Sequence, residues 1–252
     1  MTLVRIAALS DFHIGADHRA DEFGHDEDSF LDHLDRLEQT HDRIVLLGDI
    51  YQTQHGILLG RRDAGRQLTR ARRRMLRLSA RLEQPPYIYI HGNHDEIARD
   101  RLGAGESLRL ESDGFAVFFI HGHQFDPLLG RLYPAARLAT WFTGRLRHLG
   151  LGPLAETLVD KDITIKHARF GGPDGPYARA ARRLLRIHRA DAVIMGHTHI
   201  PGRLELADQS GNGGKIMANT GTCSARGFMY VSIDTERRSV ELVRERSGVT
   251  AL

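Results

Sequence analysis

The sequence predicts an α/β fold, because short apolar runs alternate along the chain with longer stretches that have the spacing of amphipathic helices. The main apolar runs span residues 3–9, 43–47, 87–90, 117–120 and 192–195. Each is followed by a segment that contains Asp, Asn or His. Because α/β proteins build their sites at the carboxyl ends of strands, these runs predict a polar site at one edge of a sheet.

Helical spacing follows each of the first two strands. Phe30, Leu31, Leu34 and Leu37 form a stripe that predicts a helix covering the sheet. Residues 54–82 contain a second amphipathic helix, whose arginines lie off the apolar stripe: Arg66, Arg70, Arg73, Arg77 and Arg81. These arginines indicate either an anion-binding surface, for acidic lipid headgroups or nucleic acid, or the solvated face of a core-packing helix. The solvated face is the simpler interpretation.

Residues 127–190 are predicted to form a helical insertion. Apolar residues between Leu128 and Leu149 keep a helical spacing, a second short helix is expected at 154–159, and a third at 177–188. The segment is also basic and includes Lys161 and Lys166. Basic and apolar character together suit a lid for a substrate with phosphate and acyl chains, or contact with an anionic membrane. A packing or dimerisation hairpin is the alternative.

The C-terminal part is β-rich, with alternating patterns at 228–234 and 239–243 and a hairpin turn signal at Asn212-Gly213-Gly214. A length of 252 residues fits one elaborated domain, so we expect a single domain over 1–252 with the insertion at about 127–190.

Composition is that of an ordinary soluble enzyme, with 41% hydrophobic and 27% charged residues. The single cysteine, Cys223, fits a reducing compartment, and the first residues lack the pattern of a signal peptide. We therefore expect a cytoplasmic protein, with the insertion as a candidate contact with the inner membrane face. The net charge is +3, and only three of the 35 Lys and Arg residues are lysines, which the composition of the source genome can explain.

The polar segments after the strands share one chemistry. Asp carboxylates, an Asn carbonyl and imidazoles are mixed oxygen and nitrogen donors that suit Mn, Fe, Zn or similar ions. The spacing in Asp11-x-His13 and in His197-x-His199 lets an extended segment present two donors to one region. Taken alone, Asp11 could instead cap a turn and His13 could be a solvated loop residue.

The ordered set of motifs resembles the calcineurin-like metallophosphoesterases. The motifs are Asp11-x-His13, Gly48-Asp49, Gly92-Asn93-His94-Asp95, His121 and Gly196-His197-x-His199. The resemblance implies a sandwich of two mixed β-sheets flanked by helices, and two divalent ions, with Mn²⁺ expected and Fe or Zn as alternatives. It implies that Asp11, His13 and His199 bind the first ion. By the same resemblance Asn93, His121 and His197 bind the second, and Asp49 bridges the two.

Further roles follow from the same resemblance. His94 would be catalytic, stabilising the phosphoryl charge and protonating the leaving oxygen. Asp95 either orients His94 or binds backbone amides. His123, Lys161 and Lys166 are candidate substrate contacts.

The substrate class is narrowed by departures from the family pattern. The Asp-Arg-Gly that protein Ser/Thr phosphatases carry after the bridging Asp is missing at Ile50-Tyr51-Gln52, which argues against a phosphoprotein phosphatase. Chain length and a basic, apolar insertion resemble the UDP-2,3-diacylglucosamine hydrolases, which cleave a lipid-linked nucleotide pyrophosphate. Members of that group often have Arg in place of His94 and an acidic residue in place of His123.

Three other functions remain as alternatives. A broad-specificity phosphodiesterase or phosphomonoesterase acting on a small phosphate-containing molecule is one, and a non-catalytic scaffold is another. A nuclease is the third, but we do not expect nucleic acid as a partner, because the basic residues lack interleaved aromatics for base stacking. The sequence leaves the oligomeric state open.

Overall fold

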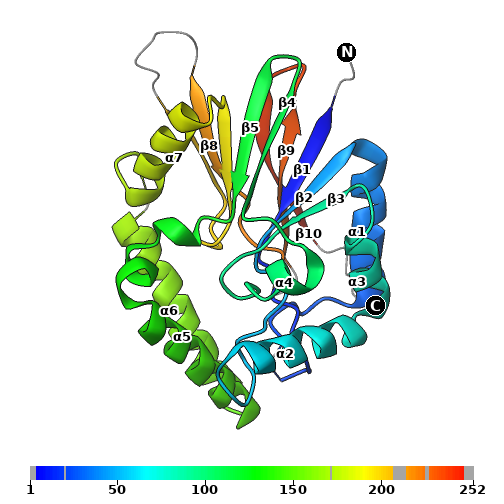
Figure 1. Cartoon of the computed structure of the whole chain (residues 1–252), viewed down its shortest axis with the longest axis vertical. Helices are drawn as coiled ribbons and strands as arrows, with labels where there is room; N and C mark the ends of the chain where they lie inside the picture. Colours follow the sequence, from blue (N-terminus) through cyan, green and yellow to red (C-terminus); the bar gives the residue numbers. More distant parts are fainter. Residues whose placement is uncertain (1–3, 20, 171, 207–213, 225–226, 247–252) are drawn as a thin grey trace.

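The computed structural model describes residues 4–19, 21–170, 172–206, 214–224 and 227–246. Figure 1 shows two sheets in the centre of the molecule, with α1, α2 and α3 on one side and α7, α5 and α6 on the other. Both sheets have five strands and mix parallel with antiparallel pairing. The α/β sandwich of two mixed sheets flanked by helices is therefore confirmed.

The first sheet has the strand order β10-β9-β1-β2-β3. β1, β2 and β3 run parallel, whereas β9 and β10 are antiparallel to their neighbours. Their bounds are Arg5–Leu9 for β1, Arg43–Leu47 for β2, Tyr87–Ile90 for β3, Gly227–Asp234 for β9 and Ser239–Arg246 for β10. The three parallel strands deliver their carboxyl ends to one edge, as the sequence predicts.

The second sheet has the order β4-β5-β6-β8-β7, with β5, β6 and β8 parallel. Its strands are β4 at Ser107–Ser112, β5 at Phe115–Ile120, β6 at Ala192–Met195, β7 at Gly202–Leu206 and β8 at Lys215–Asn219. β7 and β8 pair antiparallel up to Leu206 opposite Lys215, which agrees with the hairpin signal. The turn residues Asn212 and Gly213 lie outside the described residues.

Three apolar layers hold the sheets and helices together. The middle layer lies between the sheets and joins residues such as Val45 and Ile194. A second layer packs the first sheet against α1, α2 and α3, and a third packs the second sheet against α7. Each Å² of apolar surface removed from water contributes about 25 cal/mol to folding, so these layers are the main source of the protein's stability.

The helix expected within residues 54–82 is divided in two. α2 spans Arg61–Arg74 and α3 spans Leu76–Leu82, and the break falls at Met75, whose φ of −112° and ψ of 65° are not helical. The first helix of the chain, α1 at Glu27–Thr40, carries the predicted apolar stripe, and Asp26 caps its first turn. The short helices α4 and η1 span Ala98–Leu102 and His123–Phe125.

The segment 127–190 contains α5 at Pro127–His148, α6 at Gly152–Phe170 and α7 at Pro176–Ile187. α6 is much longer than the short helix expected at 154–159. α7 packs on the second sheet through residues such as Ala181, so only α5 and α6 project from the body of the molecule as a helical hairpin (Figure 1). Within the described residues, no helix is both long and apolar enough to cross a membrane.

Candidate metal centre and active site

The polar loops after the strands have an unusual backbone conformation. Five of their residues have positive φ angles, between 54° and 69°, in the left-handed region: Asp11, His13, Asp49, His197 and His199. Such angles are uncommon for residues other than glycine and persist only where the surrounding structure enforces them. Here the Asp11 amide donates to the carbonyl of Gly48 (3.0 Å) and the His13 amide to that of Asp49 (2.9 Å). The loops after β1 and β2 therefore fix each other.

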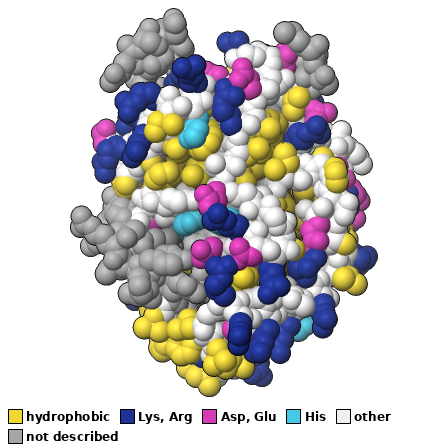
Figure 2. Space-filling view, in the orientation of Figure 1, with side chains coloured by type: hydrophobic (Ala, Val, Ile, Leu, Met, Phe, Trp, Pro, Cys, Tyr) yellow, Lys and Arg dark blue, Asp and Glu magenta, His cyan; other side chains and the backbone are white. Residues whose placement is uncertain are grey.

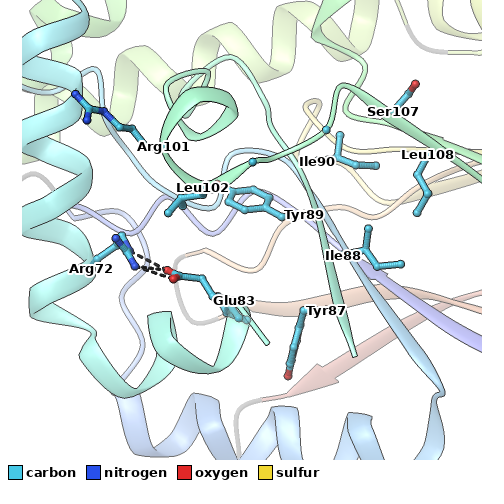
Figure 3. Close-up of a pocket in the computed structure, with 13 residues that line it drawn as sticks. Arg72, Glu83, Tyr87, Ile88, Tyr89, Ile90, Arg101, Leu102, Ser107 and Leu108 are labelled. Atoms are coloured by element: carbon cyan, nitrogen blue, oxygen red, sulfur yellow. Dashed lines mark hydrogen bonds and ion pairs between the residues drawn. The ribbon is translucent and has the colours of Figure 1, made fainter. Parts of the chain in front are cut away.

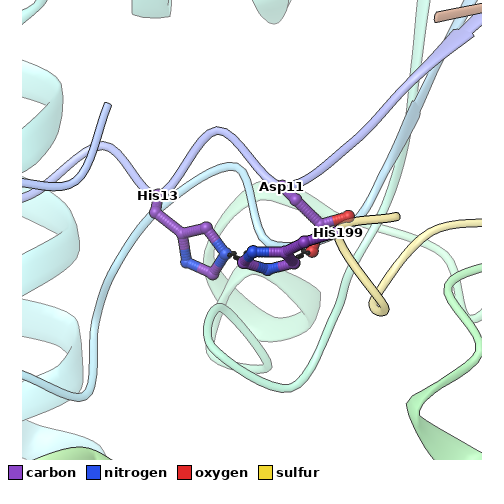
Figure 4. Close-up of side chains that lie close together, drawn as sticks. All are labelled: Asp11, His13 and His199. Carbon is purple, nitrogen blue, oxygen red and sulfur yellow. Dashed lines mark hydrogen bonds and ion pairs between the residues drawn. The ribbon is translucent and has the colours of Figure 1, made fainter. Parts of the chain in front are cut away.

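A first cluster forms where Asp11, His13 and His199 converge (Figure 4). His199 Nε2 lies 3.2 Å from Asp11 Oδ1 and 3.1 Å from His13 Nε2. The other oxygen of Asp11 accepts the backbone N–H of His197 (2.9 Å) and the Ser10 hydroxyl. This leaves Oδ1 directed at the two imidazoles.

The carboxylate charge in this cluster strongly favours a nearby positive charge. Burial by itself would raise the pKa of Asp11, but His199 and His13 hold that pKa well below its usual range. Burial would likewise lower the pKa of His13, but the hydrogen bond to Asp11 and the charge of Asp49 raise it to about 9. A cation bound by these residues would satisfy the carboxylates in the same way as the protons do.

A second cluster contains Asp49, His121 and His197. His121 Nε2 lies 3.1 Å from Asp49 Oδ2, and its Nδ1 donates to the carbonyl of Leu47 at 2.7 Å. That backbone hydrogen bond directs Nε2 towards the cluster. The buried side-chain oxygen Oδ1 of Asn93 has no hydrogen-bond partner among the described residues.

Asp49 lies between the two clusters. It groups with His121 and His197 on one side and with His13 and His94 on the other, and the ligand atoms of each group lie within 4.8 Å of one another. Burial raises the pKa of Asp49, but the neighbouring histidines hold it well below its usual range. Asp49 therefore carries a negative charge that both clusters share.

Asp95 fixes the loop that carries Asp49. Its carboxylate accepts the backbone N–H groups of Asp49 (3.2 Å), Ile50 (2.7 Å) and Gly92 (2.6 Å), and also the Tyr89 hydroxyl. Of the two roles considered for Asp95, the structure supports the bonding of backbone amides. Among the described residues, Asp95 makes no hydrogen bond to the ring of His94, which Gln52 contacts instead.

The residues of both clusters fit divalent ions. Carboxylate, imidazole and amide oxygen donors converge, and the buried Oδ1 of Asn93 has no other partner among the described residues. Close approach depends on glycine, since a Cβ at Gly92 would lie 2.2 Å from Asp49 Oδ1. A Cβ at Gly48 would lie 2.5 Å from His121 Nδ1. Gly48 and Gly92, two of the three glycines of the sequence motifs, thus leave room for the ligand side chains.

His94 lies beside the first cluster with a defined tautomer. Its ring meets the edge of His13 at a centroid distance of 4.8 Å, and Nδ1 lies 3.0 Å from Gln52 Oε1. The backbone N–H of Gln54 also donates to that oxygen, which places an N–H on Nδ1 and turns Nε2 away from Gln52. Burial lowers the pKa of His94 to about 3, so the ring is neutral near pH 7.

The candidate substrate residues divide into two groups. His123 lies beside the second cluster, with ring centroids 5.4 Å from His121 and 6.4 Å from His197, and burial lowers its pKa to about 3. Lys161 is exposed on α6, and no contact in the described part of the chain joins it to either cluster. The side chain of Lys166 lies outside the described residues.

Sequence reasoning missed several residues of the site. Glu22 lies in the loop before α1, and its carboxylate lies 3.9 Å from His13 Nδ1 and 2.9 Å from Arg147. Burial raises the pKa of Glu22, but His55, His13 and Arg147 lower it to about 2. Asp126 lies 3.1 Å from His197 Nε2. No local motif marks these residues, because their partners lie far away in the chain.

The segment 219–222 supports the first cluster. Thr222 donates to the carbonyl of Asp11 (2.8 Å), and Thr220 shares a hydrogen bond with Ser10 (2.6 Å). A separate groove of 730 Å³ runs along β3 (Figure 3) and contains no residue of either cluster, so it is not where the cluster chemistry would occur.

Comparisons with known proteins agree with these motifs. A family model described as calcineurin-like phosphoesterase matches residues 4–201, a range that contains both clusters and His94. Among proteins with curated descriptions, none is significantly similar in sequence to this chain.

Similar solved structures are distant. A metallophosphoesterase from Sphaerobacter thermophilus is 14% identical with a TM-score of 0.45, over 97% of this chain and 89% of that one. An archaeal phosphodiesterase is 15% identical with a TM-score of 0.44, over 96% and 99%. Vps29 of Entamoeba histolytica, solved with Zn²⁺, is 17% identical with a TM-score of 0.44, over 97% and 99%.

Proposed function

Because the chain belongs to the calcineurin-like phosphoesterase family, we propose that it hydrolyses a phosphate ester or pyrophosphate with two divalent ions, Mn²⁺ being the expected metal. The observation that carries the proposal is the position of Asp49 between two convergent clusters. Asp11, His13 and His199 would hold one ion, and Asn93, His121 and His197 the other. Asp49 would bind both.

The ions would supply an activated water and a positive clamp for the phosphoryl oxygens. The protein's own side chains complete the site. His94 Nε2 faces away from Gln52 and can donate to the leaving oxygen once the ring is protonated. An anionic phosphoryl group beside His94 raises its pKa and so favours that protonated form.

The backbone and neighbouring carboxylates hold these groups in place. Asp95 fixes the loop of Asp49, Leu47 orients His121, and Asp126 contacts His197. Such supporting contacts set the direction of metal-binding side chains and their basicity. No nucleophilic serine or cysteine is needed, and Cys223 is buried with a pKa raised to about 12 by burial.

For the substrate we propose a lipid-linked nucleotide pyrophosphate of the UDP-2,3-diacylglucosamine type. One support is that the basic, apolar insertion resembles that of the UDP-2,3-diacylglucosamine hydrolases. The other is the position of α5, which starts directly after Asp126 beside the second cluster. His123 also lies beside the second cluster, so it is a better candidate for contact with the substrate than Lys161. A broad-specificity phosphodiesterase or phosphomonoesterase is the second candidate.

The test measures release of UMP from UDP-2,3-diacylglucosamine, and in parallel turnover of bis-p-nitrophenyl phosphate, with Mn²⁺ present. His94→Ala is expected to lower kcat for an active substrate by about 10²–10⁴-fold while the metal content stays unchanged. His188→Ala is the matched control, because this ring stacks on Phe118 and touches no residue of either cluster.

The outcomes separate the proposals. UMP release that depends on His94 supports the lipid pyrophosphate, and turnover of the chromogenic diester alone rejects that substrate while keeping the two-metal hydrolase. Absence of both activities in protein that contains metal would contradict hydrolysis and favour a scaffold.

A further inference from the structure

A large apolar surface lies at one end of the molecule. The described residues include twelve strongly exposed large apolar side chains, and nine of them fall in the loop before α2, in α5, in α6 or in the turn between these two helices. The nine are Ile57, Leu58, Leu59, Leu138, Phe142, Leu149, Leu151, Leu154 and Leu158. We call them the apolar tip. Figure 2 shows apolar side chains gathered at the lower end of the molecule.

The parts of the apolar tip are fixed to one another. Trp141 Nε1 on α5 donates to the carbonyl of Ile57 (3.2 Å), and Arg145 donates to the carbonyls of His55 (3.2 Å) and Gly56 (3.1 Å). Gly144 packs so closely that a Cβ there would lie 2.9 Å from His55. The loop and the hairpin therefore present their leucines as one ordered surface.

The exposed side chains are not explained by packing within the chain. Leu58 is 63% exposed and Leu149 is 75% exposed, although Leu146, one turn earlier on α5, is buried. Clustered apolar side chains of this kind on a projecting end typically mark an interaction site. Because α5 and α6 project from the body of the molecule (Figure 1), this surface suits insertion into a partner better than the capture of a peptide.

A row of arginines begins beside the apolar tip. Gly60 alone separates Leu59 from α2, and the Leu58 amide lies 3.4 Å from Asp63 in the first turn of that helix. Arg62, Arg66, Arg70 and Arg73 follow at spacings of four, four and three, which places them along one side of α2. We call these four residues the arginine row. Figure 2 shows basic side chains beside the apolar end.

The arginine row differs from the other arginines of α2 and α3. Arg61 pairs with Asp100, Arg74 with Asp21 and Arg81 with Glu38. Arg72 donates two hydrogen bonds to Glu83, at 2.8 and 2.7 Å (Figure 3). No carboxylate among the described residues pairs with the four members of the row. They line a groove of 540 Å³ together with Arg72 and Arg101, and no acidic side chain lines it.

From these two features we propose that the apolar tip and the arginine row form a docking surface for an anionic lipid bilayer. The leucines would enter the boundary between headgroups and acyl chains, and the arginines would contact lipid phosphates. Charge complementarity selects this partner, since an apolar partner alone would not explain unpaired guanidinium groups along the adjoining helix. The surface is formed by α2, by the loop that precedes it and by the insertion. It includes no residue of the two clusters.

The experiment measures co-sedimentation of the full chain with two kinds of vesicle. One contains phosphatidylcholine and phosphatidylglycerol in equal parts, and the other contains phosphatidylcholine alone. Binding is expected only to the anionic vesicles, and it should weaken as salt is raised. His94→Ala should bind as the unmodified chain does, so a failed hydrolysis test leaves this result interpretable.

Two pairs of substitutions test the two halves of the surface. Leu58→Ser with Leu149→Ser is expected to lower the partition coefficient by roughly tenfold or more. Arg66→Gln with Arg70→Gln is expected to lower it by roughly fivefold per arginine. Ile187→Ser is the apolar control, since Ile187 is 55% exposed on α7, and Arg237→Gln is the basic control on an exposed turn.

Several outcomes would overturn the proposal. Equal binding to both kinds of vesicle, or binding that neither pair of substitutions weakens, would do so. A dimer in light scattering that dissociates on the leucine substitutions, without vesicle binding by the unmodified chain, would instead assign the apolar tip to a second copy of the chain.

Discussion

The metal centre and the apolar tip are built in opposite ways. At the metal centre, side chains such as Asp11 and Asp49 are buried, and hydrogen bonds hold their loops in strained conformations. At the apolar tip, Leu58 and Leu149 are exposed although the backbone beneath them is well fixed. Residues at the centre therefore contribute to folding and function together, whereas residues at the tip contribute to stability very little.

The largest effect is expected at Asp49. Asp49→Asn removes the charge that both clusters share, so kcat/KM for a phosphodiester should fall by about 10³-fold or more. Bound metal, measured by elemental analysis, should fall with it. Asp35→Asn, an exposed carboxylate on α1 paired with Arg81, is the control and should change neither quantity. Full activity in Asp49→Asn would remove the centre from the reaction.

A substitution at Gly92 tests how closely the backbone packs against the side chain of Asp49. The added Cβ of Gly92→Ala would collide with Asp49 Oδ1 at 2.2 Å, so we expect weaker metal binding and a loss of about 1–3 kcal/mol in the free energy of unfolding. Gly105→Ala is the matched control, because its nearest neighbour would lie at 3.6 Å. Metal titration and urea denaturation measure both effects, and equal behaviour of the two variants would refute the close packing.

This contrast also explains what the sequence alone could predict. The ligand candidates were predicted from the resemblance to the calcineurin-like family, because its motifs occur in this chain in the same order, and the structure brings their carboxylates and imidazoles together. The strands β2, β3 and β6 were predicted because their apolar runs are nearly continuous. β4 and β7 lie at the edges of their sheet, and each has only two apolar side chains, so the alternation is too short to signal a strand.

Other features depend on contacts that no local pattern records. Gln52 and Glu22 reach His94 and His13 through tertiary packing alone. The break at Met75 interrupts an apolar stripe that remains periodic across it. Leu146 and Leu149 have the same helical spacing, yet one is buried and the other exposed, so periodicity could not reveal the apolar tip.

A third prediction concerns pH and the protons held at the centre. His13 and His121 have pKa values raised to about 9 and about 10 from 6.5, because the carboxylates beside them outweigh the effect of burial. In chelator-treated protein, protonated histidines therefore stabilise the fold fully below pH 6.5 and lose that effect as pH rises towards 10. The melting temperature should fall over this interval. His13→Gln should flatten the fall, and a rising melting temperature would contradict the assignment.

The same histidines must be neutral to bind a metal ion, so added Mn²⁺ should reverse the slope. Metal binding near pH 7 should then release protons, which calorimetry in buffers of different ionisation enthalpy can count. Metal binding without proton release would mean that His13 and His121 are already neutral.

The smallest effect is expected at the apolar tip. Leu149→Ser removes a side chain that is 75% exposed and contributes little buried area, so the free energy of unfolding should change by no more than about 0.5 kcal/mol. Turnover of a soluble phosphodiester should stay unchanged, because the side chain touches no residue of either cluster in the described structure. Leu146→Ser, one turn earlier and buried, is the matched comparison and should lose about 2–4 kcal/mol. If both substitutions destabilised the protein equally, Leu149 would be packed in solution, and the tip would be covered by a part of the protein itself or by a second copy.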